Sequence, residues 1–224
     1  MKMVGNVLMI AGGEVDISFA EDYIRGKEFD MVVCADSGLD AAFLLGLPVH
    51  YAMGDFDSVS EGVLRHYRQD GQQTEFVEYP AEKDATDSQI VLEWITERFP
   101  SEIHILGATG NRLDHFLANL TILMKPLSYG IPAYLIDSRN KIYLLDHSRV
   151  IQRKELFGTY ISFLPLTEKA VVSLKGFRYE LDRKVMTIGD SLGISNEIGE
   201  GKDSALVMLE EGILIAVESR DKEL

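Results

Sequence analysis

The amino-acid sequence predicts an α/β protein made of an N-terminal parallel-sheet domain followed by a smaller all-β, sandwich-like domain. Before residue 140, short apolar runs and helical patterns alternate about six times, which is typical of a parallel sheet with helices on both faces. After residue 140, strand-like segments follow one another without a helical pattern between them. The chain has 224 residues, of which 46% are hydrophobic, and this is enough for one large domain or two small ones.

The strands expected in the first part are short apolar runs bounded by glycine, proline or polar residues. They cover residues 7–11, 31–35, 49–53, 76–79, 103–106 and 133–137. Helical spacing of apolar residues predicts helices over residues 39–45, 61–69, 86–98 and 112–123. In the third of these helices, Ile90, Trp94 and Ile95 lie on one apolar side, which would face the sheet.

The strands expected in the second part are separated by turns that contain glycine, aspartate or proline. They cover residues 141–145, 158–164, 170–174, 178–181, 184–188, 205–209 and 213–217. We therefore expect an α/β nucleotide- and metal-binding catalytic domain over residues 1–143 and an all-β domain over residues 144–224.

The charge balance excludes several classes of partner. The chain carries 36 acidic and 22 basic residues, a formal net charge of -14, which repels a phosphate backbone and disfavours nucleic-acid binding. A polyanionic substrate would need metal ions to bridge it to this protein.

The single cysteine, Cys34, excludes an internal disulfide. The apolar run 7–11 is too short for a signal-peptide core or a membrane span, so we expect a cytoplasmic protein without a membrane partner.

Acidic residues and glycines concentrate where the predicted parallel strands end. The segments are 35–38 (ADSG), 54–58 (GDFDS), 83–87 (KDATD) and 107–115 (GATGNRLDH). Ligands of open parallel sheets bind at the carboxyl ends of the strands, so we expect these segments to converge on one rim of the sheet.

The aspartates of two segments have a spacing that suits a metal ion. Asp55 and Asp57 would leave an extended segment on the same side and could share a hard cation. Asp84 and Asp87, three apart at a predicted helix start, could cap the helix or turn toward the same metal. Each motif alone is also typical of an ordinary turn or cap. Magnesium prefers one or two carboxylates together with substrate phosphates, so the whole set favours a magnesium nucleotide.

The glycine-containing segment 107–115 is typical of a phosphate site. Backbone N–H groups at a helix start favour phosphate, and the guanidinium of Arg112 can bind phosphate oxygens in a bidentate way. The alternative is an ordinary turn in which Arg112 and Asp114 are solvated or paired. His115, Cys34 and Trp94 are expected to be packing residues.

In this order and at these separations, the four segments closely resemble those of bacterial thiamine pyrophosphokinases. The sequence GISNE at 193–197 extends the resemblance into the all-β part. The resemblance implies transfer of the diphosphoryl group of ATP to thiamine, giving thiamine diphosphate and AMP. It also implies a homodimer, with each site between the α/β domain of one subunit and the thiamine-binding, dimerising β domain of the other.

The resemblance further implies roles for individual residues. Magnesium would be held by Asp55, Asp57 and Asp87, with Asp84 and Asp114 nearby as catalytic ligands or organisers of the hydroxyl group. Lys83 and Arg112 would face the phosphates, and the nucleotide side would be lined by Asp36, Ser37, Gly38 and Thr109. Ser195 and Asn196 would meet the aminopyrimidine of thiamine from the partner subunit.

Two departures and two alternatives accompany the resemblance. Asn111 stands where many relatives have glycine. This change is tolerable because asparagine accepts left-handed backbone angles. Eukaryotic relatives stack thiamine on a tryptophan of the β domain, whereas the only tryptophan here, Trp94, lies in the α/β part, so the stacking residue is unassigned.

One alternative is a glycosyltransferase that holds a metal-bound sugar nucleotide through Asp55 and Asp57. The other is a sensor of thiamine or its diphosphate that kept the fold without turnover.

Overall fold

A computed structural model describes residues 4–69, 73–80, 84–110 and 112–221. The chain divides into two compact units, Met1–Ser138 and Arg139–Leu224. The expected boundary after residue 143 falls inside strand β7 (Asn140–Leu145). This strand pairs along its length with β13 (Leu214–Ser219), and that pairing places it in the second unit.

The first unit is built on a parallel sheet with the strand order β4-β3-β2-β1-β5-β6. The strands are β1 (Asn6–Ile10), β2 (Met31–Ala35), β3 (Tyr51–Gly54), β4 (Glu75–Glu78), β5 (Glu102–Leu106) and β6 (Ala133–Ile136). All five residues of β2 are buried, as expected for a strand covered on both faces. The order reverses at β1, which has β2 on one side and β5 on the other.

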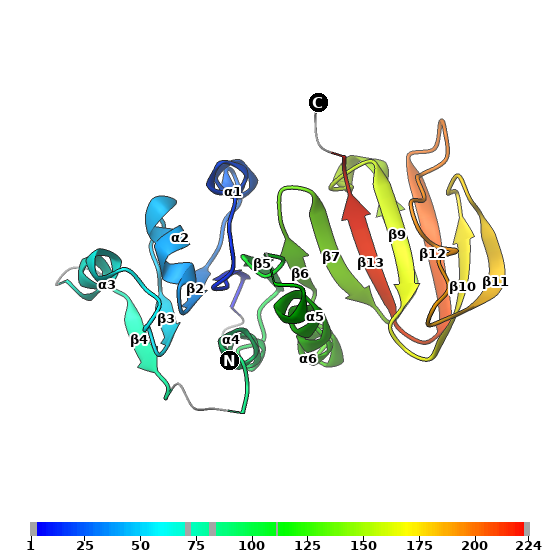
Figure 1. Ribbon diagram of the computed structural model, residues 1–224. Helices are drawn as coiled ribbons and strands as arrows, with labels where there is room; N and C mark the ends of the chain where they lie inside the picture. Colours follow the sequence, from blue (N-terminus) through cyan, green and yellow to red (C-terminus); the bar gives the residue numbers. More distant parts are fainter. Residues whose placement is uncertain (1–3, 70–72, 81–83, 111, 222–224) are drawn as a thin grey trace. The chain divides into compact units, whose positions relative to one another are not determined.

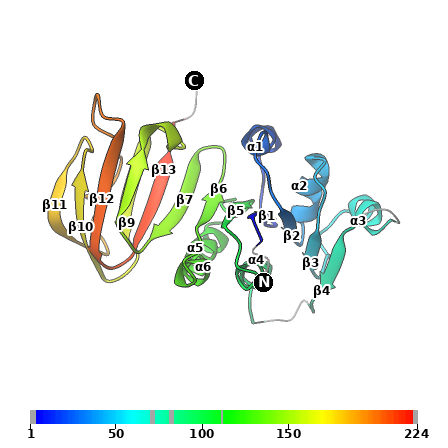
Figure 2. The same cartoon turned by 180° about the vertical axis from the view of Figure 1, so that it is seen from behind.

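Helices cover both faces of this sheet (Figures 1 and 2). The helices are α1 (Ile17–Ile24), α2 (Gly38–Leu44), α3 (Glu61–Arg68), α4 (Asp87–Thr96), α5 (Leu113–Ile122) and α6 (Met124–Ser128). Helix α2 packs on β1, β2 and α3, while α4 packs on β2, β3, α5 and α6. In the part of the chain that the structure describes, no helix is long and apolar enough to cross a bilayer.

Two of these helices have no counterpart among the sequence-based predictions. Helix α1 is only eight residues long and fully buries only Ala20. Its start is fixed by Asp16, whose side chain accepts a hydrogen bond from the Phe19 N–H. Helix α6 follows α5 directly and contains Pro126 in its first turn, where proline is tolerated.

The second unit contains antiparallel strands in the orders β7-β13-β9 and β11-β10-β12-β8. The remaining strands are β8 (Arg149–Gln152), β9 (Tyr160–Pro165), β10 (Lys169–Lys175), β11 (Leu181–Thr187) and β12 (Ser204–Glu211). Burial alternates along β13, as expected where one face of a strand meets a core. The predicted fold class, a parallel α/β domain followed by an all-β sandwich-like domain, is therefore confirmed.

In this unit one strand was missed and one prediction was wrong. Strand β8 is short and was not expected. The strands expected over 178–181 and 184–188 are a single strand, β11, and residues 178–180 precede it in a turn. Strand β11 is an edge strand that buries only Met186, so its apolar pattern was too weak to define its ends.

Candidate active site

Three carboxylates from neighbouring strands meet at the carboxyl ends of β2 and β3. Asp36 follows β2, and Asp55 and Asp57 follow β3, which pairs with β2 in parallel. Each side chain offers one oxygen, and these oxygens lie within 4.8 Å of one another. Because the carboxyl ends of parallel strands share one edge of the sheet, the topology itself brings the acids together.

The loop that carries Asp55 and Asp57 is a turn and not the extended segment expected from their spacing. Phe56 has a left-handed backbone, with φ 61°, and its buried ring packs edge-on against Phe76 with 5.4 Å between the centroids. The N–H of Asp57 donates a hydrogen bond of 3.3 Å to Oδ1 of Asp55. The buried ring therefore fixes a turn that directs both carboxylates to one place.

The electrostatics of this group favour a divalent cation. The pKa of Asp57 is raised chiefly by the negative charge of Asp55, with loss of solvation and the charges of Asp36 and Asp87 adding to it. Oδ2 of Asp36 accepts a hydrogen bond from Ser58, whereas its buried Oδ1 receives none from any described residue. The three carboxylates repel one another, and one oxygen of Asp36 accepts no hydrogen bond from any described residue. Carboxylate oxygens in such a group are the hard ligands that Mg²⁺ or a similar ion prefers.

The structure thus adds Asp36, expected on the nucleotide side, to the carboxylates expected to hold metal. Of the two aspartates near the start of α4, neither caps the helix, because Oγ1 of Thr86 accepts from the N–H of Gln89 at 3.2 Å. Asp87 lies close enough to the site for its charge to act on Asp57. Asp84 is exposed and does not line the neighbouring cavity.

A cavity of about 340 Å³ lies in the first unit where the strand order reverses. It is formed by the loop after β1, the end of β2 with the loop that follows it, the first turn of α4, and the loop after β5 with the start of α5. Its lining residues are Gly12, Gly13, Glu14, Ala35, Asp36, Ser37, Thr86, Asp87, Ser88, Gly107, Ala108, Gly110, Arg112, His115, Phe116 and Asn119.

Glycines let two loops of this cavity pack backbone against backbone. The N–H of Gly13 donates a hydrogen bond of 2.9 Å to the carbonyl of Gly107, and a Cβ at Gly13 would lie only 2.3 Å from that oxygen. Gly107 itself has φ +71°. Sequence reasoning did not identify Gly12 and Gly13. The signal was present, since the pair follows a predicted strand directly.

Arg112 reaches the cavity while paired with Asp114. Its Nε lies 3.2 Å from Oδ1 of Asp114, and its terminal nitrogen 2.6 Å from Oδ2. These hydrogen bonds are the main reason that the pKa of Asp114 is lowered to about 2. The pair is exposed, so it contributes little stability and can open for a phosphate group.

The other residues expected on the nucleotide side are placed differently from one another. Ser37 lines the cavity, and its hydroxyl donates a hydrogen bond of 3.1 Å to the carbonyl of Gly12. Gly38 is buried outside the lining, and a Cβ there would lie 2.2 Å from the carbonyl of Ile10, so its smallness serves the packing of α2. Thr109 lies between lining residues without itself lining the cavity. Lys83 and Asn111 lie outside the described residues.

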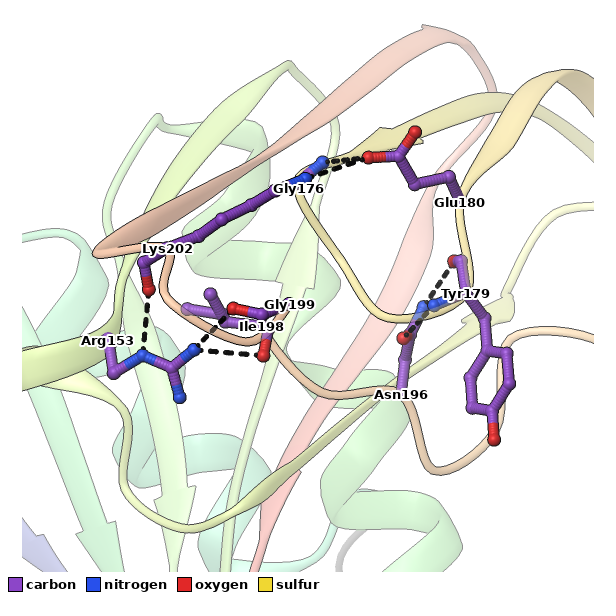
Figure 3. A network of polar contacts seen from close by, with 8 residues as sticks. All are labelled: Arg153, Gly176, Tyr179, Glu180, Asn196, Ile198, Gly199 and Lys202. Atoms are coloured by element: carbon purple, nitrogen blue, oxygen red, sulfur yellow. Dashed lines mark hydrogen bonds and ion pairs between the residues drawn. The ribbon is translucent and has the colours of Figure 1, made fainter.

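In the second unit, the two residues expected to contact thiamine have opposite environments. The side chain of Ser195 is exposed, with its backbone left-handed at φ 53° and its N–H bonded to Oγ of Ser162 at 3.0 Å. Asn196 is only 2% exposed. Its Oδ1 accepts from the N–H groups of Tyr179 at 3.0 Å and Glu197 at 2.9 Å, and its Nδ2 donates to the Tyr179 carbonyl at 2.8 Å. Figure 3 shows the two hydrogen bonds between Asn196 and the backbone of Tyr179.

Comparison with known proteins covers both units. The family model "Thiamin pyrophosphokinase, catalytic domain" matches residues 25–135, and "Thiamin pyrophosphokinase, vitamin B1 binding domain" matches residues 147–214. The thiamine pyrophosphokinase of Bacillus subtilis (strain 168) is 35% identical over 197 residues, which are 88% of this chain and 86% of that protein.

Solved structures give the same result. The crystal structure of the Bacillus subtilis thiamine pyrophosphokinase matches with a TM-score of 0.85 and 31% identity over 97% of this chain and 100% of that one. A thiamin pyrophosphokinase family protein from Enterococcus faecalis matches with a TM-score of 0.80 and 30% identity over 97% of this chain and 100% of that one. The chain therefore belongs to the thiamine pyrophosphokinase family of enzymes and carries both of its domains.

Proposed function

We propose that the chain transfers the diphosphoryl group of ATP to the hydroxyl group of thiamine. The thiamine oxygen forms a bond to the β-phosphorus, the bond between that phosphorus and the α–β bridging oxygen breaks, and AMP leaves with the bridging oxygen. The hydroxyl proton passes to a carboxylate. The observation that carries this proposal is the group of Asp36, Asp55 and Asp57 beside a cavity at the reversal of strand order. Family membership favours this reaction over that of a glycosyltransferase.

Asp36, Asp55 and Asp57 are the residues that we expect to hold Mg²⁺, with Asp87 beside them. The unpartnered buried oxygen of Asp36 and the raised pKa of Asp57 support this assignment. When bound, the ion would neutralise charge that builds on the β-phosphate and the bridging oxygen.

The other cavity residues would bind and orient the nucleotide. The lining residues of the loops after β1 and β5, together with Ser37, are the ones that we expect to contact it. Arg112 would exchange Asp114 for phosphate oxygens, and Lys83 is also expected to face the phosphates. Asp84 and Asp114 remain candidates for organising the thiamine hydroxyl, and Thr109 for the nucleotide side.

Thiamine would be recognised by the second unit, because residues 147–214 match the vitamin B1 binding model and carry Ser195 on their surface. We propose a homodimer in which this unit completes the site of the partner subunit. ATP is the donor, so we place the reaction in the cytoplasm, where ATP is supplied. The net charge of -14 suits a cationic thiazolium ring and argues against nucleic acid as a partner.

One assay tests the function. The protein is incubated with ATP, Mg²⁺ and thiamine, and the products are separated by chromatography. We expect equal amounts of AMP and thiamine diphosphate, both absent when Mg²⁺ is chelated. Thiamine binding by calorimetry without any product would contradict the proposal and would favour the thiamine sensor instead.

A further inference from the structure

The turn that carries Asp55 and Asp57 is supported by a residue outside the carboxylate group. Phe56, at the centre of this turn, has a left-handed backbone that bulky residues rarely adopt. We infer that Phe76, on the edge strand β4, is a positioning residue, which holds the ring of Phe56 and thereby keeps the two carboxylates together for a divalent cation. This inference rests on the proposed function, because it concerns how the first unit binds the metal of the nucleotide.

The backbone of Phe56 is the reason that the turn needs support. Its φ of 61° costs free energy, and such a conformation persists only where the surrounding structure enforces it. The hydrogen bonds inside the turn are long. The Asp57 N–H donates to Oδ1 of Asp55 at 3.3 Å, and the Val59 N–H donates to the carbonyl of Phe56 at 3.4 Å. These bonds are weak restraints, so the packing of the Phe56 ring has to hold the turn.

The ring of Phe56 packs on β4, the strand at the edge of the sheet (Figure 1). It is 6% exposed and meets the Phe76 ring edge-on, with 5.4 Å between the centroids and 67° between the planes. Strand β4 is attached to the end of β3, because the N–H of Tyr79 donates to the carbonyl of Gly54 at 3.1 Å. Phe76 is therefore fixed relative to the strand that leads into the turn.

An arginine at the end of α3 contacts Phe76 as well. The guanidinium carbon of Arg68 lies 4.9 Å from the ring centroid of Phe76 and 6.0 Å from that of Phe56. A terminal nitrogen of Arg68 donates to Oε1 of Glu78 at 2.5 Å, which holds the guanidinium in place. This ion pair is exposed and contributes little stability by itself. It completes a series of contacts that runs from α3 through β4 to the turn.

Loss of the Phe76 ring would act on the carboxylates through this series. Phe56 would lose its packing partner, and its backbone could then relax to ordinary angles. Asp55 and Asp57 repel each other, so a relaxed turn would let them move apart. A cation would have to bring them back together on binding, and its affinity would fall by that cost.

Binding of Mn²⁺ to the protein without nucleotide measures this effect. Mn²⁺ suits the same carboxylate oxygens as Mg²⁺, and electron paramagnetic resonance counts the free ion. We expect Phe76→Ala to raise the Kd for Mn²⁺ about tenfold, through loss of the ring contact and relaxation of the turn. Phe76→Tyr, which keeps the ring, should stay within about twofold of wild type. In Phe76→Ala the kcat should recover at saturating Mg²⁺, because all the carboxylates are still present.

A double-mutant cycle tests whether Phe76 acts through Phe56. In Phe56→Gly the turn keeps its backbone without strain but has no ring for Phe76 to hold. Adding Phe76→Ala to Phe56→Gly should therefore change the Kd for Mn²⁺ less than about twofold further. Independent, multiplying effects of the two substitutions would overturn the inference, because Phe76 would then act by another route.

Tyr51→Ala is the matched control. Tyr51 begins β3 and packs edge-on against Trp94, with 4.5 Å between the centroids, and the guanidinium carbon of Arg98 lies 3.2 Å from the Trp94 ring centroid. This group has the same kinds of side chain, at the end of β3 that is remote from the carboxylates. Its loss should lower the melting temperature without raising the Kd for Mn²⁺.

The outcomes separate the inference from the proposed function. A wild-type Kd for Mn²⁺ in Phe76→Ala would overturn the inference. If that variant does not fold, Phe76→Leu decides, with a rise of about threefold expected and an unchanged Kd overturning the inference. An equal rise in Tyr51→Ala would overturn it too, because general loss of stability would then suffice. A wild-type chain that forms no thiamine diphosphate would instead contradict the proposed function, while its Mn²⁺ binding would still test Phe76.

Discussion

The two units differ in how far the polar side chains of their candidate sites are paired within the protein. In the first unit, Asp36, Asp55 and Asp57 lie on strand-end loops, repel one another and leave a buried oxygen without a donor. In the second unit, the polar atoms of Asn196 are bonded to backbone, and the group left exposed is the Tyr179 ring. The first arrangement keeps negative charge that no described residue balances, whereas the polar side-chain atoms of Asn196 in the second are already paired.

This difference reflects the chemistry of the two proposed substrates. The cation of a magnesium nucleotide would balance the negative charge of the carboxylates when it binds. A site for it can therefore keep carboxylates that repel one another in the free protein, at some cost to stability. A flat organic cation offers less charge density, so its site depends more on shape and on a surface already held in place. The following predictions test whether the two units divide the work in this way.

The largest effect is expected from Asp57→Asn in the first unit. Loss of one ligand of the proposed metal should lower kcat about 100-fold or more, because charge on the phosphates is then poorly neutralised. The fold should persist, since the side chain is exposed. Asp22→Asn, which changes an exposed aspartate on α1, is the control. Wild-type kcat in Asp57→Asn at saturating Mg²⁺ would exclude Asp57 as a metal ligand.

Arg112→Ala should affect the nucleotide and not thiamine. We expect the KM for ATP to rise about tenfold or more, since a charge-assisted contact to phosphate is lost. The kcat should also fall if the guanidinium follows charge that develops on the phosphates. Steady-state kinetics with each substrate varied in turn measure this, with Arg25→Ala, directly after α1, as the control. A similar rise in the thiamine KM would contradict the proposal that the first unit binds the nucleotide and the second unit binds thiamine.

Complementation tests whether a site is built from two chains. Asp57→Asn and a Ser195→Ala/Asn196→Ala double variant should each be inactive for different reasons. After subunit exchange, random pairing leaves one intact site in half of the dimers, so about a quarter of the wild-type activity should return. Exchange proven by mass spectrometry without recovered activity would show that each site is made by one chain.

The smallest effect concerns the pH dependence of stability without metal. The pKa of Asp57 is raised in the folded protein, so the folded state binds more protons than the unfolded one, and stability falls as pH rises through that range. At neutral pH the full repulsion is present. Asp57→Asn should therefore slightly raise the melting temperature of the metal-free protein at pH 7, with the gain shrinking toward acidic pH. A lower melting temperature than wild type at pH 7 would contradict the repulsion.

Much of the fold could be predicted because its patterns are local. The buried runs of β1 and β2 and the apolar side of α4 are set by hydrophobic spacing. Helix α1 was missed although Ile17, Ala20 and Ile24 have helical spacing, because the helix is only eight residues long. The turn at 178–180 escaped because its polar bonds go to Asn196 and Glu197, far along the chain.

The sequence by itself determined the family, the alternation of strands and helices, and the positions of the strand-end carboxylates, since each depends on residues close together in the chain. Only the tertiary structure decided which of those groups meet. Parallel pairing of β2 with β3 brings Asp36 to Asp55 and Asp57, and the reversal of order at β1 sets Gly13 against Gly107. It also decided that Ser195 is exposed while Asn196 is buried, because that depends on which distant backbone each neighbour packs against.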